Sequence, residues 1–194
     1  MLAGRLYFSI KDKQLASEWN HCQTLLKQYN DCDGEETDKK FALLEQILQA
    51  KLDPKSPPLI QPPFRCEYGY NIRLGRGVYM NFGCTFLDCN VIEIGDDVLF
   101  GPNVQIYPPQ HPIDPLVRNG LRGPEYALPV RIGNNCWIGG AAIIMGGVTV
   151  GEGCIIGAGA VVTRDIPPWC VAVGSPARVV KQAKPGDKTA KELP

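Results

Sequence analysis

The sequence predicts a mainly β protein in which short parallel strands wind into a regular coil. Aliphatic residues return at every sixth position between residues 132 and 162 (Ile132, Ile138, Ile144, Val150, Ile156 and Val162). A Cys, Ala or Val lies two positions before most of them, and a glycine often follows. A six-residue period matches neither an α-helical stripe nor simple strand alternation, but it suits a parallel coil whose strands are separated by turns.

The same spacing occurs upstream, in two further groups of three apolar residues (Leu74, Met80 and Phe86, then Ile94, Phe100 and Ile106). Two residues inserted within 88–92 predict a bulge at a corner of the coil. The step from Ile94 to Ile132 leaves about twenty residues beyond the repeat, which predicts an extruded loop.

Before the coil, the sequence predicts two amphipathic helices. Within residues 11–30, apolar residues at alternating spacings of four and three make one helical stripe (Leu15, Trp19, Cys22, Leu26 and Tyr29). After a polar break, a second apolar face follows (Phe41, Leu44, Ile47 and Leu48). Neither helix is long enough to be stable alone, so we expect a two-helix cap docked on the first coils.

Composition divides the chain into three parts. Residues 53–63 are rich in proline and predict an extended connector. Residues 183–194 are polar, and we expect a flexible tail. The predicted domains are a helical cap and connector at 1–57, a β-helix domain at 58–182 and the tail at 183–194.

Charge and cysteine content narrow the function classes. Twenty basic and twenty acidic residues give no net charge, so we expect neither nucleic acid nor an anionic membrane as partner. No secretion signal or membrane-spanning run is evident, which favours a cytoplasmic protein with free thiols. Three of the eight cysteines, Cys84, Cys136 and Cys154, fall on small-residue positions of the repeat and are predicted to be buried.

Only two histidines can exchange a proton near neutral pH. His21 lies off the apolar stripe of the first predicted helix and is interpreted as a partly exposed structural residue. His111 lies in the extruded loop between Pro109 and Pro112, which restrict the backbone and can hold an imidazole in place. Spacing alone leaves a catalytic role and a solvated loop histidine as equal alternatives.

Several motifs resemble a known family. Three stretches of the repeat, at 132–140 (IGNNCWIGG), 156–167 (IGAGAVVTRDIP) and 173–179 (VGSPARV), resemble the hexapeptide-repeat acyltransferases. Further stretches are similar to the maltose and galactoside O-acetyltransferases among them (MLAG at 1–4, PPFRCEYG at 62–69, and NVQIY at 103–107 followed by His111-Pro112). The resemblance implies a left-handed parallel β-helix, a homotrimer and acetyl-CoA as donor. The handedness comes only from the resemblance.

The resemblance also implies the reacting groups. His111 matches the base that removes a proton from a sugar hydroxyl as it attacks the thioester. Gly140 matches a backbone donor for the carbonyl oxygen, although a glycine there also suits a coil turn. Asn81 matches an active-site asparagine, and its alternative role is a corner residue whose side chain binds nearby backbone.

For the acceptor, Asp88 lies close to a family carboxylate, with an exposed turn aspartate as the competing interpretation. Glu125, in the same loop as His111, is expected to orient the imidazole or accept from a sugar hydroxyl, and its alternative is simple solvation. The galactoside branch has an acceptor-binding aspartate near the N-terminus, and Ser9 stands there in this chain. That difference leaves the acceptor open.

For the donor, the resemblance assigns CoA contacts to residues of the last coils (Ala158, Thr163, Arg164, Arg178 and Lys181). Arginine suits a string of phosphates because its fork binds two oxygens at once. Without the resemblance, these basic residues are interpreted as solvated surface.

The leading functional prediction is an acetyl-CoA-dependent transfer of an acetyl group to a sugar hydroxyl of maltose, glucose or galactoside type. Alternatives are a non-catalytic scaffold or CoA-binding protein, and an acetyltransferase for a non-sugar alcohol or a xenobiotic. Zinc carbonic anhydrases share this type of coil, but they bind the metal through three histidines. This chain has only two histidines, so no metal is expected.

Overall fold

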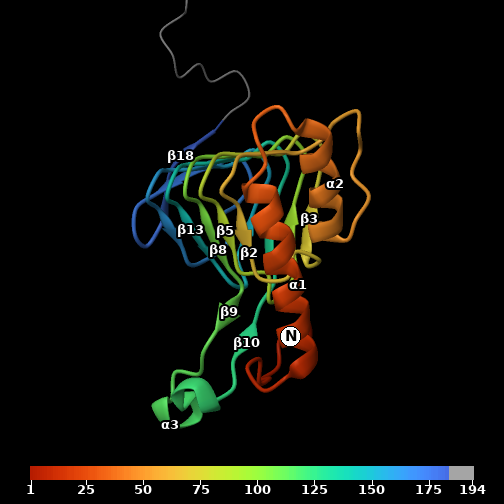
Figure 1. The fold of residues 1–194 in the computed structure, drawn as a ribbon. Helices are drawn as coiled ribbons and strands as arrows, with labels where there is room; N and C mark the ends of the chain where they lie inside the picture. The colour runs from red at the N-terminus through yellow and green to blue at the C-terminus, as the bar shows by residue number, and fades with distance from the viewer. Residues whose placement is uncertain (184–194) are drawn as a thin grey trace, which may run out of the picture.

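The computed structural model describes residues 1–183, and three β-sheets form the three faces of its coil (Figure 1). The first face contains β1 (Leu59–Ile60), β4 (Tyr79–Met80), β7 (Leu99–Phe100), β12 (Trp137–Ile138), β15 (Ile155–Ile156), β17 (Cys170–Val173) and β18 (Arg178–Gln182). The second face contains β2 (Arg65–Cys66), β5 (Thr85–Phe86), β8 (Gln105–Tyr107), β13 (Ile143–Met145) and β16 (Val161–Val162). The third face contains β3 (Ile72–Leu74), β6 (Ile92–Ile94), β11 (Val130–Ile132) and β14 (Thr149–Val150).

The chain visits the first, second and third faces in turn, and neighbouring strands within a face are parallel except for the final pair, β17 and β18. This arrangement is a left-handed parallel β-helix, so the predicted fold class is confirmed. The tail predicted at 183–194 lies almost entirely outside the described residues.

The six-residue repeat is confirmed by the strand register. Leu74, Ile94, Ile132 and Val150 stack in one column of the third face, and the other two faces have equivalent columns. These side chains point into the coil, where nearly all of them are buried. The three cysteines predicted at small-residue positions are buried as well. Each fully buried Val or Ile stabilises the fold by about 1.5–3 kcal/mol relative to an exposed one, so stacked coils supply the core that no single coil has.

Two helices cover the start of the coil, as predicted. In α1 (Lys13–Asn30), Asp12 accepts hydrogen bonds from the first-turn amides and caps the helix. The buried face of α1 includes Leu25, which the predicted stripe omitted, whereas Trp19 is 41% exposed and its place in that stripe was wrong. The second helix is α2 (Thr37–Leu48). None of the helices in residues 1–183 is long and apolar enough to cross a membrane.

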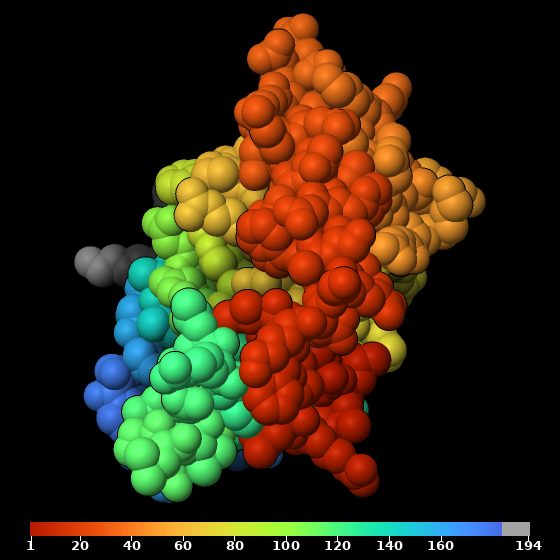
Figure 2. All heavy atoms as spheres, turned by 60° about the horizontal axis from the view of Figure 1, so that its bottom comes forward, coloured from red at the N-terminus to blue at the C-terminus, as the bar shows by residue number. Residues whose placement is uncertain are grey.

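The extruded loop is a projecting arm, residues 108–128 (Figure 1). Its stem pairs β9 (Pro109–Gln110) with β10 (Tyr126–Ala127) in antiparallel register, and its tip carries α3 (Pro115–Arg118) and a 3-10 turn, η1 (Gly120–Arg122). The N-terminal residues pack against this arm (Figure 2), and the backbones of Tyr7 and Glu125 form an isolated bridge. The arm therefore has structure of its own, which the repeat did not predict.

Candidate active site

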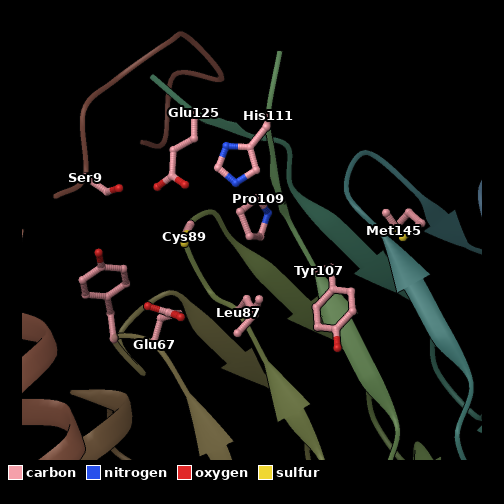
Figure 3. Close-up of a pocket in the computed structure, with 10 residues that line it drawn as sticks. Ser9, Glu67, Leu87, Cys89, Tyr107, Pro109, His111, Glu125 and Met145 are labelled. Carbon is pink, nitrogen blue, oxygen red and sulfur yellow. The ribbon is translucent and has the colours of Figure 1, made fainter. Parts of the chain in front are cut away.

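A pocket of about 430 Å³ opens where the arm leaves the coil (Figure 3). Its walls come from the N-terminal segment, two corners of the coil and the arm. The polar and reactive side chains that line it are those of Ser9, Glu67, Tyr68, Cys89, Tyr107, His111 and Glu125. Both of the loop residues predicted to act together, His111 and Glu125, therefore face one pocket.

His111 follows β9 directly, between the stem of the arm and Pro112. Its imidazole points into the pocket (Figure 3), and no hydrogen bond to it is present within residues 1–183. An imidazole with a free ring nitrogen can accept the proton of a bound hydroxyl.

Glu125 is positioned by the N-terminal segment. Its N–H donates to the carbonyl oxygen of Tyr7 and its carbonyl oxygen accepts from the N–H of Tyr7, both at 2.9 Å. The Glu125 carboxylate lies beside the His111 ring on the same side of the pocket as Ser9 (Figure 3). The hydroxyl of Tyr7 is buried against Glu125 and Cys89, and burial raises its pKa. The arm and the N-terminal segment thus build this wall together.

Asp88 does not line the pocket. Its side chain is completely buried, and its carboxylate accepts hydrogen bonds from the backbone N–H groups of Glu67 at 2.9 Å, Tyr68 at 2.8 Å and Asn71 at 3.3 Å. Burial raises the pKa of Asp88, while these N–H bonds act in the opposite direction. The alternative of an exposed turn aspartate was therefore wrong. A direct contact between Asp88 and the acceptor stays a prediction, and the buried position of this side chain does not support it.

Two pocket residues that flank this buried carboxylate were not among the predicted site residues. Glu67 follows β2 and Cys89 follows Asp88, so both lie at corners of the coil. Burial raises the pKa of the Cys89 thiol to about 12, and the nearby Glu67 adds to the shift. The only signal in the sequence was the motif around Glu67, because its neighbours in the pocket are far away along the chain.

Three predicted residues lie along the corner between the first and second faces. Asn81 follows β4, Gly140 lies just after β12, and Ala158 lies just after β15. The side-chain oxygen of Asn81 accepts from the N–H of Phe82 at 2.8 Å, which is the corner bond expected of a turn residue. A Cβ at Gly140 would lie 3.1 Å from the Cδ of Pro102, so close packing also favours glycine there.

The remaining predicted donor residues lie elsewhere on the last coils. Thr163 and Arg164 follow β16, on the corner between the second and third faces from which the arm also starts. Arg178 and Lys181 lie on the exposed strand β18. One chain therefore places Asn81 and Gly140 on one corner and the arm with His111 on another, with the second face between them, and does not bring Asn81 to His111.

No group of three or more His, Cys, Asp or Glu residues within 1–183 is arranged to hold a metal ion. The pocket residues instead suit proton transfer and hydrogen bonding to a polar ligand.

Two family models match the chain. Residues 129–164 match the bacterial transferase hexapeptide (six repeats), and residues 1–51 match the maltose acetyltransferase hexapeptide capping motif. A galactoside O-acetyltransferase from Escherichia coli K12 is 39% identical over 166 residues, which cover 86% of this chain and 79% of that protein.

Solved structures agree with these matches. A maltose O-acetyltransferase from Clostridium difficile 630 shares 43% identity with a TM-score of 0.89, and the match covers 95% of each chain. A galactoside acetyltransferase in complex with coenzyme A shares 34% identity with a TM-score of 0.87, over 98% of this chain and 93% of that one. The chain therefore belongs to the hexapeptide-repeat acyltransferases, in the family of the maltose and galactoside O-acetyltransferases.

Proposed function

We propose that this protein transfers the acetyl group of acetyl-CoA to a hydroxyl of a small acceptor of the sugar type, with His111 as general base. The observation that carries the proposal is the pocket at the base of the arm, into which the unpartnered imidazole of His111 points. Its size, about 430 Å³, suits a small polar molecule.

The chemistry follows from the bond changes in acyl transfer. His111 accepts the hydroxyl proton while the acceptor oxygen forms a bond to the thioester carbon. The carbonyl oxygen gains negative charge, and the N–H of Gly140 is the proposed donor to it. When the carbon–sulfur bond breaks, the CoA thiolate takes the proton back from His111. Glu125 orients the imidazole or accepts from another hydroxyl of the acceptor.

For the donor, we propose that CoA runs along the last coils. Ala158 lends backbone to its thin amide-bearing arm, while Thr163, Arg164, Arg178 and Lys181 bind its phosphates. The exposure of Arg164 and Arg178 supports this assignment, because a phosphate can reach them. The bound coenzyme A in the related galactoside acetyltransferase supports the choice of donor.

We also propose that three copies assemble, so that one chain's arm meets a neighbour's first corner. On the outer side of the first face, Leu59, Leu99 and Trp137 stand in one register column with Tyr79. Their side chains are 56%, 49% and 54% exposed. A continuous apolar column of this kind suits an interface with another copy. In such a trimer, Asn81 and Gly140 of one chain would lie beside His111 of a neighbouring chain, an arrangement that a single chain does not form.

The two histidines offer a matched test. His111→Ala is expected to lower the rate of thiol release from acetyl-CoA with a sugar acceptor by about 100-fold or more, because general-base catalysis is lost. His21→Ala is the control, since His21 is exposed on α1 and does not line this pocket. Equal turnover by the two variants would end the assignment of His111 as base.

A further inference from the structure

The pocket at the base of the arm has more acidic than basic side chains in its lining. Glu67 and Glu125 face it from opposite walls (Figure 3), and neither lysine nor arginine is among its lining residues in the described chain. Arg118 lines an adjoining hollow of about 310 Å³ that Glu125 also lines, but its guanidinium donates to the carbonyl oxygens of Pro112 at 3.0 Å and Ile113 at 3.2 Å and forms no ion pair with either glutamate in the described chain. The charges of the two glutamates are therefore not balanced by a cation in the pocket wall.

A third carboxylate lies behind the wall that carries Glu67. The backbone N–H of Glu67 donates to the buried side chain of Asp88, which fixes the start of this corner. Burial, Asp88 and Glu125 all raise the pKa of Glu67, against a hydrogen bond from the Trp19 indole. Two carboxylates that face each other across a partly buried pocket favour a ligand with positive charge.

We propose that the preferred acceptor carries a protonated amine beside the hydroxyl that is acetylated, and that Glu67 binds this ammonium group. The proposal rests on the proposed function, because it concerns the acceptor side of the same pocket. An ammonium group supplies one positive charge and three N–H donors, which can reach carboxylates on both walls. A neutral sugar supplies hydroxyl donors but leaves the two negative charges without compensation. An amino sugar or an amino alcohol has the required chemistry.

This arrangement also determines which acceptor atom reacts. A carboxylate that binds the ammonium form keeps the amine protonated, so its nitrogen has no lone pair for attack. The hydroxyl proton passes to His111, the hydroxyl oxygen forms the new ester bond, and the carbon–sulfur bond of acetyl-CoA breaks. His111 then returns the proton to the thiolate, and the acceptor's amine stays protonated throughout. The expected product is an O-acetyl ester with a free amine.

The test compares amine and neutral acceptors with acetyl-CoA as donor. Glucosamine and galactosamine are paired with glucose and galactose, and thiol release gives kcat/KM for each. The wild-type protein is expected to prefer the better amine by about tenfold or more, as one charge-assisted hydrogen bond allows. Mass spectrometry with alkaline hydroxylamine treatment distinguishes the labile ester from a stable amide.

Three variants test whether the charge of Glu67 causes the preference for amine acceptors. Glu67→Gln is expected to reduce the ratio of amine to neutral kcat/KM to near one, whereas Glu67→Asp keeps the charge and restores part of the ratio. Glu35→Gln removes the same charge at an exposed position outside the pocket, so its ratio should match the wild type. Measuring a ratio within each variant cancels general losses of folding or donor binding.

The outcomes separate the two proposals. Turnover of neutral sugars with no preference for amines overturns the amine proposal and leaves the proposed function intact. A preference that survives in Glu67→Gln, or an amide product, also overturns it. No thiol release with any acceptor overturns both proposals.

Discussion

At the residue scale, the site depends on the different environments of three neighbouring acidic side chains. Asp88 is buried and bonded by three backbone N–H groups, so it holds the corner in shape. Glu67 and Glu125 face the pocket, where water or an acceptor can reach them. Partner groups, rather than residue type, thus distinguish the structural carboxylate of Asp88 from the two carboxylates that we propose bind the acceptor.

The partly buried position of Glu67 predicts that the free energy of unfolding depends on pH. Its pKa is raised above the ordinary 4.5, so the folded state binds the proton more tightly than the unfolded chain. The free energy of unfolding therefore falls as the pH rises from the ordinary pKa of a glutamate through the raised pKa of Glu67. Glu67→Gln lacks the ionised form, so its melting temperature at pH 7 should exceed that of the wild type, and the gap should narrow toward pH 4. A gap that is the same at both pH values would contradict the assigned cause.

At the element scale, the coil was predictable because its information is local. Each hexad places an aliphatic residue inward, and the register columns through Leu74, Met80 and Phe86 follow directly from that spacing. The arm was predictable only as an extruded segment, because pairing of β9 with β10 depends on contacts across the loop. The error at Trp19 has a similar origin, since the helical stripe shows an apolar face but not how far the docking surface extends.

The bridge between the N-terminal segment and the arm makes a testable contribution to catalysis. Tyr7→Pro removes the N–H that donates to Glu125, and a displaced wall is expected to lower kcat/KM by about tenfold or more. Tyr7→Phe is the matched control, because it removes the hydroxyl and keeps the backbone pair. A kcat/KM for Tyr7→Pro equal to that of Tyr7→Phe would show that the bridge does not position the site.

At the scale of the whole molecule, one chain contains all the candidate residues but does not assemble them. His111 lies on the arm, whereas Asn81 and Gly140 lie on the corner beyond the second face. Sequence motifs pointed to these candidate residues, whereas Glu67 was not predicted because its proposed role depends on Glu125 across the pocket. No spacing along one chain predicts which corners meet when copies assemble.

The apolar column on the first face predicts how assembly can be broken. Trp137→Glu places a charge in the middle of this column, so light scattering after gel filtration should give the mass of one chain rather than three. Acetyl transfer should be lost in parallel. A variant that keeps the mass of three chains would place the interface elsewhere.

The central claim, that His111 of one copy works with Asn81 of another, is tested most directly by mixing two inactive variants. His111→Ala and Asn81→Ala chains are co-expressed, and thiol release is compared with that of each variant alone. Random mixing in a cyclic trimer gives about a quarter of the sites an intact His111 and an intact Asn81 from different chains, so about a quarter of wild-type activity should return. A mixture of confirmed hetero-trimers that stays as inactive as its two components would contradict the shared site.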